Sequence, residues 1–456
     1  MRSRRSRLTA LAMAGLLVLT ACGDDDDGGE EGTGGGDTSG QEGGGSEGGG
    51  GGENTGTVNL MSAGEPEEVE AYQQIFDDLI TSETDYEVEV ESVGDFEEQF
   101  QIRAEGETLE LAAVPQPGAI PALVDAGSIV SLEDLGFDIE ELNNTLGESF
   151  VALGEYNGQH YGIPTNINLK SMVWYPKDDF DAAGYTVPTT FEELIALSDQ
   201  MVADGNTPWC VGFESGGATG WPATDWMEDI MLRTAGPDVY DQWVAHEIPF
   251  NDPAILAAAE QMKTMWFTDG YVFGGNTRIN ATWVGDSQTP MFDAAGPKCW
   301  MHKQAAWIPD FWPKDAAGNA QFTPGEDSSF FYFPPIDAAH GSPVLGGGDM
   351  FVMFNDRPEV RALMQWFSTT DAVKDRVATG GFLAANNAVP ADWYTSYPMS
   401  GLAEIAREAT ALRFDASDSM PKEVGAGTFW SGMVKWVSQN GEGTDQIFAD
   451  IEASWP

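Results

Sequence analysis

The sequence predicts an α/β fold of two lobes, the first of them built on a parallel sheet flanked by helices. Residues 57–456 form a body of 400 residues after an amino-terminal leader, and a single core stops growing at roughly 250–300 residues. Strand and helix patterns alternate over residues 57–114, which is typical of a parallel sheet with right-handed crossovers. An Asn157-Gly158 turn then leads into an extended run that suits a passage between lobes.

The leader has the layout of an export signal. Four arginines lie within the first seven residues and precede the apolar run Leu8–Leu19, which is too short to span a bilayer. The run ends in Leu19-Thr20-Ala21-Cys22, which resembles the lipobox of bacterial lipoproteins. The resemblance implies that residues 1–22 are a lipoprotein signal and that Cys22 becomes the lipidated first residue. A simple secretory peptide with an incidental cysteine is the alternative.

Residues 23–56 contain mainly Gly, Asp, Glu, Ser and Thr. This composition buries no apolar surface, so we expect a disordered acidic tether that holds the globular body near the membrane's outer face. The acidic run Asp24–Asp27 lacks the spaced ligands and glycine of a calcium loop. We therefore interpret it as solvated chain.

The formal net charge of −53 is extreme for 456 residues. Nucleic acids and anionic lipid surfaces would repel such a chain, which excludes both as partners. The charge itself indicates an acidic, soluble surface, suited to salty surroundings that screen the repulsion. Besides Cys22, the chain has only Cys210 and Cys299. Export favours one disulfide between them, and two separate buried thiols remain the alternative.

The first part of the body reads as β-α-β-α-β. Strands are expected at Thr57–Met61, Tyr86–Val90 and Leu109–Val114, with helices at Val69–Leu79 and Phe96–Arg103. In a parallel sheet the ligand lies beyond the carboxyl ends of the strands. The loops Ala63-Gly64-Glu65 and Pro115–Gly118 are therefore expected to contact it.

The extended segment after the hairpin carries a family resemblance. Gly158-x-x-Tyr161-Gly162-Ile163-Pro164 resembles the crossing segment of extracellular solute-binding proteins that serve ABC importers, the sugar-binding family in particular. By itself the motif also fits an ordinary hairpin. The next stretch strengthens the resemblance: a strand Met172–Tyr175, then Phe180, an Ala183-Gly184 turn, and Pro188-Thr189-Thr190-Phe191-Glu192-Glu193-Leu194 opening a helix through Met201. Thr190 and Glu193 have the spacing of a capping box.

The resemblance implies the type II-like periplasmic-binding-protein fold, in which two lobes, each a mostly parallel sheet flanked by helices, are joined by three crossings of the chain. The N-terminal lobe would consist of residues 57–164 plus 338–370, and the C-terminal lobe of residues 165–337 plus 371–456. We expect the second crossing at Phe330–Pro335 and the third within residues 372–456. Strands at Ser342–Leu345 and Met350–Phe354 flank glycines that let a ligand approach the backbone. Helices are expected at Ile255–Phe267 and Pro358–Phe367. The family's Gly…Ala-Met…Gly-Pro-Trp segment is altered here, because Pro290 replaces Ala and Lys298-Cys299 separate Pro297 from Trp300.

Motifs for catalysis are missing from the sequence. The four histidines have no metal-binding spacing, and there is no Gly-x-Ser-x-Gly, phosphate loop or HExxH. The glycines at 216–220 lack the spacing of a nucleotide fingerprint. We expect no metal, no cofactor and no enzymatic activity. Because paired carboxylates are inevitable in so acidic a chain, a carbohydrate-active enzyme remains an alternative.

Tryptophans and acids suit a carbohydrate site, because flat rings cover the apolar faces of a sugar while carboxylates and amides bind its hydroxyls. The polar candidates on strand ends and near the crossing are Glu65, Gln116, Asn166, Asn168, Glu214, Asp225 and Asp349. The stacking candidates are Trp174, Trp221, Trp226 and Trp300, and Gly348 is the point of close backbone approach. For each acid the alternative is a solvated or capping carboxylate, and for each tryptophan it is the core.

We therefore expect an exported, lipid-anchored, monomeric solute-binding protein that captures a sugar between its lobes and delivers it to an ABC permease. The loops Pro115–Gly118 and Gly346–Pro358 resemble those of α-glucoside and maltose binders, with other oligosaccharides next. A peptide or polyamine binder is the alternative ligand class, since acidic loops favour a cation. Whether Lys170 reaches the cleft is left open.

Overall fold

The computed structural model describes residues 56–63, 66–80, 86–93, 96–106, 109–318, 320–379, 382–385 and 389–456. The expected export signal and nearly all of the tether lie outside these residues, as does Glu65. The chain from Gly52 to Pro456 forms one compact unit. Among the described residues, no helix combines the length and apolar character needed to cross a bilayer.

A five-stranded sheet organises the first part of the body. Its order is β2 (Glu87–Ser92), β1 (Thr57–Ser62), β3 (Leu111–Val114), β12 (Met350–Met353), β6 (Gly162–Pro164). Strand β1 pairs in parallel with β2 and β3, whereas β12 runs antiparallel to β3 and β6. Together with α1 (Pro66–Leu79) and α2 (Phe96–Glu105), this confirms the predicted β-α-β-α-β run. The carboxyl ends of β1 and β3 lead into Ala63 and Pro115.

The hairpin before the first crossing is a tight two-residue turn. Strands β4 (Glu155–Tyr156) and β5 (Gln159–His160) pair antiparallel around Asn157 at φ 54° and Gly158 at φ 79°. Positive φ at both central residues is the type I′ geometry that an Asn-Gly pair favours. The chain then enters β6 as the sequence predicts.

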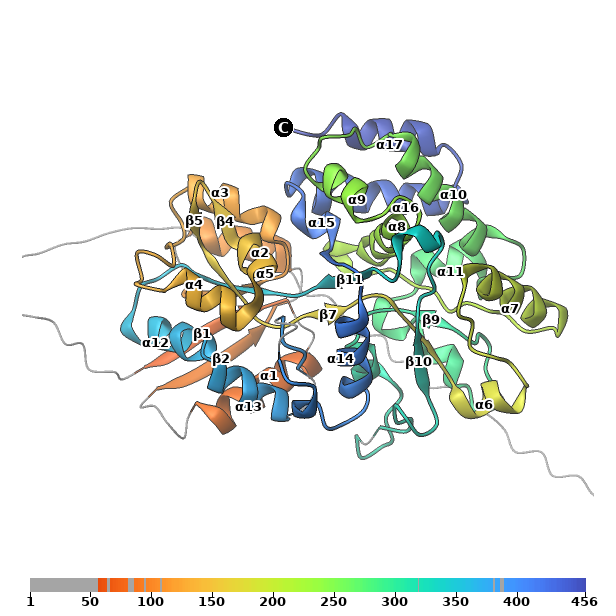
Figure 1. Ribbon diagram of the computed structural model, residues 1–456, viewed down its shortest axis with the longest axis horizontal. Coiled ribbons are helices and arrows are strands. Elements are labelled where there is room, and N and C mark those ends of the chain that lie inside the picture. Colours follow the sequence, from red (N-terminus) through yellow and green to blue (C-terminus); the bar gives the residue numbers. More distant parts are fainter. Residues whose placement is uncertain are drawn as a thin grey trace, which may run out of the picture. The chain divides into compact units, whose positions relative to one another are not determined.

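A second sheet is built from three distant passages of the chain. Its order is β13 (Leu412–Phe414), β11 (Val344–Gly347), β7 (Asn168–Leu169). Strand β11 runs parallel to β13 and antiparallel to β7, and Figure 1 shows β7 and β11 side by side. This sheet therefore brings three segments close together: the residues after β7, the residues after β13, and the loop between β11 and β12.

A third sheet has the order β10 (Ser329–Tyr332), β8 (Met172–Tyr175), β9 (His302–Lys303). Its regular pairings are antiparallel, and parallel pairing here is limited to single bridges such as Trp209–Met301. The expectation that Phe330–Pro335 is the second crossing is therefore corrected. That segment pairs with β8 because its aromatic side chains pack on Trp174 and Tyr175, and the return to the first sheet runs through β11 into β12.

Helices surround this third sheet. Thr190 caps α7 (Phe191–Ala203) by accepting a hydrogen bond from the Glu193 amide at 3.2 Å. The Glu193 carboxylate accepts from the amide of Thr189 at 2.8 Å and also interacts with the backbone of Thr190, as the predicted capping box requires. The other helices of this part are α6 (Lys177–Ala182), α8 (Trp221–Thr234), α9 (Pro237–Val244), α10 (Pro253–Phe267), α11 (Gly275–Ala281), α16 (Trp430–Ser438) and α17 (Thr444–Glu452).

The remaining helices are α3 (Ile120–Asp125), α4 (Ile139–Leu142), α5 (Glu148–Val151), α12 (Pro358–Phe367), α13 (Thr370–Thr379), α14 (Met399–Glu408) and α15 (Ala416–Ser419). The core around α8 and α10 is rich in indoles, with Trp209, Trp243, Trp266 and Trp436 nearly or fully buried. Cys210 and Cys299 form a disulfide across a sequence separation of 89 residues. It joins the segment before α8 to the segment before β9.

Candidate functional site

A cavity of about 260 Å³ lies where the three passages of the chain meet. It is lined by Gln116 after β3, Asn168 on β7, Lys170 after β7, Asp349 after β11, and by residues of α8, α15 and the segment 283–311. Small-molecule sites usually measure roughly 300–1,000 Å³. The cavity is therefore suited to one small ligand.

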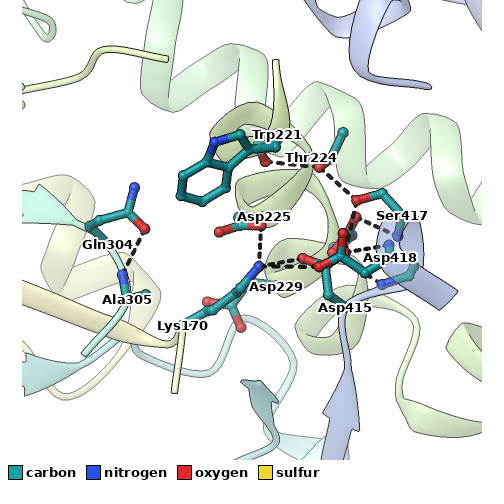
Figure 2. Close-up of polar contacts among 12 residues, drawn as sticks. Lys170, Trp221, Thr224, Asp225, Asp229, Gln304, Ala305, Asp415, Ser417 and Asp418 are labelled. Atoms are coloured by element: carbon teal, nitrogen blue, oxygen red, sulfur yellow. Dashed lines mark hydrogen bonds and ion pairs between the residues drawn. The ribbon is translucent and has the colours of Figure 1, made fainter. Parts of the chain in front are cut away.

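The floor of the cavity is a buried cluster of charges centred on Lys170 (Figure 2). The Lys170 ammonium lies 2.9 Å from Asp225 Oδ1 and 2.6 Å from Asp415 Oδ2, and 4.0 Å from Asp418 Oδ2. Asp225 comes from the second turn of α8, and the other two acids follow β13. One cation thus connects the β7 passage to α8 and to the β13 passage.

Gly347 makes room for the Lys170 side chain. A Cβ added at Gly347 would lie 2.7 Å from Lys170 Cε, which is closer than carbon atoms can pack. Gly347 pairs with Asn168 in the β11–β7 ladder, so a side chain here would push the lysine away from its carboxylates. The glycine is therefore part of the site's construction.

The charges of the cluster shift one another's pKa values. Burial alone would lower the pKa of Lys170, but attraction to Asp225 and Asp415 outweighs it and raises the pKa well above its usual value. Burial raises the pKa of Asp225 to about 8, against the attraction of Lys170. Burial would also raise the pKa of Asp415, but Lys170 and hydrogen bonds lower it instead. The surroundings thus favour the ionised forms of Lys170 and Asp415, whereas burial works against the ionised form of Asp225.

A second buried cluster supports the first. Asp229 pairs with Arg233 and with Lys303, whose Nζ lies 3.1 Å from Asp229 Oδ2. The same Lys303 Nζ donates to the backbone carbonyl of Lys170 at 3.1 Å, and Ser171 Oγ donates to Asp229 at 2.7 Å. Lys303 and Asp229 therefore hold the backbone at Lys170 and Ser171 in place.

Polar groups without protein partners face the cavity. The side chains of Gln116, Asn168 and Asp349 line it, and within the described part of the chain no hydrogen bond to these side-chain groups is present. Burial raises the pKa of Asp349 to about 6, against the attraction of Lys170. Burial, followed by the charge of Asp415, raises the pKa of Asp418 well above its usual value. These groups are available to donate to and accept from a polar ligand.

Aromatic rings form another wall of the cavity. Trp221 and Trp307 have centroids 5.9 Å apart, Trp307 and Phe311 5.4 Å, and Trp283 and Phe311 5.5 Å. All four line the cavity together with Trp430, whose Nε1 donates to Ser417 Oγ at 3.2 Å. The cavity therefore combines a wall of mutually tilted aromatic rings with a polar floor.

Half of the residues proposed from the sequence line this cavity: Gln116, Asn168, Trp221, Asp225, Gly348 and Asp349. Three proposed stacking residues lie in the core instead. Trp174 is fully buried and donates to the Gln304 carbonyl at 3.1 Å, Trp226 packs against Trp209 and Trp266, and Trp300 packs against Tyr185. Their rings have no access to a ligand in the cavity.

Two proposed polar residues are used locally. The Glu214 carboxylate accepts from the amide of Gly216 at 2.9 Å, and Asn166 Oδ1 accepts from Thr165 Oγ1 at 3.0 Å. Neither residue lines the cavity. Glu65 lies outside the described residues, so its expected role stays a prediction.

The structure places Lys170, whose position the sequence left open, at the cavity. The sequence did not indicate several other residues that line it: Trp283, Trp307, Phe311, Asp415, Ser417, Asp418 and Trp430. Asp415, Ser417 and Asp418 follow β13 directly, and recognising Leu412–Phe414 as a strand would have indicated them. Trp307 and Phe311 lie on a short 3₁₀ segment with no such local signal.

Comparison with known proteins identifies the family. A model of the bacterial extracellular solute-binding proteins matches residues 63–374, which is more than half of the chain. The chain belongs to this family. The resemblance seen in the crossing segment is thereby confirmed.

Two relatives of this solute-binding protein match most of its length. The alpha-glucosides-binding periplasmic protein AglE of Rhizobium meliloti is 39% identical over 380 residues, covering 82% of this chain and 81% of that protein. The osmoprotective compounds-binding protein GgtB of Synechocystis sp. is 38% identical over 377 residues, covering 82% and 87%.

Solved structures confirm the two-lobed α/β fold of the solute-binding proteins. The solute receptor AcbH superposes with a TM-score of 0.72 at 19% identity, covering 88% of this chain and 97% of that one. Maltose-bound MalE3 of T. maritima gives a TM-score of 0.65 at 13% identity, covering 88% and 98%. At these identities the likeness concerns the fold alone.

Proposed function

We propose that this protein is the membrane-tethered component of an ABC importer, and that it captures a small sugar in the cavity and delivers it to a permease. The observation that carries the proposal is the pairing of unpartnered polar groups with an indole wall. Asp349, Gln116 and Asn168 provide acceptors and donors for hydroxyl groups, while Trp221 and Trp307 offer flat apolar surfaces. A sugar has both kinds of surface on one ring.

An α-glucoside of one or two sugar units is the ligand we favour. The cavity volume of about 260 Å³ suits a short ligand, and a relative of 39% identity is named as an alpha-glucosides-binding protein. A relative of 38% identity is named for osmoprotective compounds. A small glucoside agrees with the name of the first of these relatives, and its hydroxyl groups suit the polar floor of the cavity.

We also propose that the protein binds the sugar without altering it chemically. Asp415 is paired with the Lys170 ammonium and its pKa is lowered, which is unfavourable for a general acid. The family consists of binding proteins of transporters. The lipobox at Cys22 and the polar tether support attachment to the outer face of the cytoplasmic membrane.

A ligand screen tests the proposal directly. Purified protein is heated with maltose, trehalose, sucrose or spermidine, and hits are measured by isothermal titration calorimetry. A ligand that binds only the folded protein raises the melting temperature, so we expect a shift with at least one disaccharide, which is recovered unchanged. A shift with spermidine alone, or cleavage of a disaccharide, would overturn the proposal in favour of a polyamine binder or an enzyme.

A further inference from the structure

We propose that Lys170 is a specificity-determining residue that restricts the cavity to uncharged ligands, because its ammonium permanently fills a carboxylate cage that would otherwise hold a cation. The inference deepens the proposed function and rests on it for the identity of the uncharged ligand. The cage itself is defined by protein atoms alone.

The cage consists of Asp225, Glu228 and Asp415. One carboxylate oxygen of each lies within 4.8 Å of the others, and all three residues are buried. Asp225 Oδ2 has no hydrogen-bond partner within the described part of the chain. Three converging carboxyl groups supply the oxygen ligands that hard divalent cations prefer. Burial raises the pKa values of Asp225 and Glu228, so a cation bound there would displace their protons. If the Lys170 side chain were absent, these three acids would attract a metal ion or the amine of a ligand.

Lys170 contacts two of the three acids of this cage, whereas the third, Glu228, accepts from the amides of Ala416 and Ser417. The Lys170 Nζ lies 2.9 Å from Asp225 and 2.6 Å from Asp415, so two of its three N–H donors have carboxylate acceptors. The next acid, Asp418, is 4.0 Å away and beyond hydrogen-bond distance. One N–H remains for an oxygen atom in the cavity that Lys170 lines. A hydroxyl or ether oxygen can accept it, whereas a cationic ligand is repelled by the ammonium.

The lysine is also held so that a ligand cannot displace it. Its side chain is 9% exposed and lies against Gly347, and its ammonium is 5.4 Å from the centroid of the Trp221 ring. The Lys170 amide donates to Leu345 at 2.8 Å, and Lys303 holds its carbonyl. The cage is therefore filled whether or not a ligand is bound.

The test compares the full-length protein with the variant Lys170→Met, using Mn²⁺ and trehalose as probes. Mn²⁺ binding is followed by electron paramagnetic resonance and trehalose binding by calorimetry. Lys177→Met is the matched control, because Lys177 forms an exposed pair with Asp181 on α6, outside the residues that line the cavity. The double variant Lys170→Met/Asp415→Asn removes a cage carboxylate as well. Lys170→Gln is used in place of Lys170→Met if the latter does not fold.

We expect Lys170→Met to gain one Mn²⁺ site that the wild type and Lys177→Met lack, and the double variant to lose it. Trehalose affinity should fall at least about tenfold in Lys170→Met, since a charged donor is removed. A folded Lys170 variant without an added Mn²⁺ site would overturn the inference, as would a wild type that binds Mn²⁺ in the cage. If trehalose binds to no variant, the proposed sugar ligand is in question, while the Mn²⁺ comparison still decides the role of Lys170.

Discussion

At the residue scale, Trp307 and Trp174 present the same side chain in opposite surroundings. Trp307 lines the cavity and is partly exposed, whereas Trp174 is fully buried against Trp312 and Phe330. We predict that Trp307→Ala lowers ligand affinity about tenfold through lost stacking and changes the free energy of unfolding little. Trp174→Ala should instead cost about 3–5 kcal/mol of stability.

Calorimetry and denaturant unfolding measure the two quantities for both variants. Equal losses of stability in the two variants would show that Trp307 is a core residue and would remove it from the site.

Asp349 provides a pH prediction. Burial raises the pKa of its carboxyl to about 6, whereas in an unfolded chain the pKa of an aspartate is about 3.9. Between these values the folded protein binds more protons, so the contribution of Asp349 to stability decreases as the pH rises from about 4 to about 6 and is constant above. Asp349→Asn should therefore be more stable than the wild type by about 1–2 kcal/mol above pH 6, allowing for solvent screening in the cavity.

Near pH 4 the difference in stability should vanish. Urea unfolding of both proteins across this pH range checks the prediction, and a difference that does not depend on pH would contradict it. We expect Asp349→Asn to bind the ligand more weakly than the wild type, because the substitution removes a charged hydrogen-bond acceptor.

Residue-level prediction from the sequence works at strand ends and weakens on helices. Asp349 lies in the loop between β11 and β12, and Gln116 lies in the loop after β3. The position of these loops at strand ends indicated both residues. Trp221 and Trp226 were proposed together, but the structure places both on α8, five positions apart and thus about 140° apart around the axis. Trp221 therefore faces the cavity while Trp226 is 3% exposed. Without the helix orientation, the sequence could not separate them.

At the element scale, the end of β11 supports the ion cluster. A methyl group at Gly347 would collide with Lys170 Cε at 2.7 Å, and the ammonium beyond it is held by two carboxylates. We predict that Gly347→Ala destabilises the protein by about 1–3 kcal/mol, as overpacking does. In a Lys170→Ala background the same substitution should cost much less, which a double-mutant cycle by thermal unfolding measures. Additive costs would show that the glycine acts through the backbone alone.

The disulfide connects two segments that contribute to the aromatic wall. Cys210 precedes the segment with Trp221, and Cys299 lies between Trp283 and Trp307. Replacing both cysteines by serine should cost about 2–4 kcal/mol, because the bond closes a long loop. Ligand affinity should also fall as the indoles lose their fixed spacing. Unfolding and calorimetry with and without reductant measure both effects, and serine variants with unchanged affinity would limit the bond to a role in stability.

Elements with strong local signals were predicted from the sequence, and elements defined by distant partners were not. Asn157-Gly158 determines its turn, and the period of Ile255–Phe267 determines its helix. Phe330–Tyr332 is extended as expected, but nothing local shows that its partner is β8 rather than a strand of the first sheet. The short β13 has the same problem, so the acids that follow it went unrecognised.

At the scale of the whole molecule, charge is the dominant feature. Most of the chain's net charge of −53 lies within residues 57–456, where it creates repulsion across the folded surface. Raising the salt from about 0.01 M to 0.15 M shortens the Debye length from about 30 Å to about 8 Å. We predict that the melting temperature rises over this range. Calorimetric scans with sodium chloride measure the shift, and a melting temperature that falls with salt would show that attractive pairs outweigh the repulsion.

The order of the five-stranded sheet has a consequence for biosynthesis. Strand β12, at residues 350–353, lies between β3 and β6, which are complete by residue 164. Until the ribosome has polymerised more than three quarters of the polypeptide, both neighbours expose open edges. The five-stranded sheet therefore stays incomplete for most of the chain's synthesis, and an incompletely folded chain is able to pass through a secretion pore.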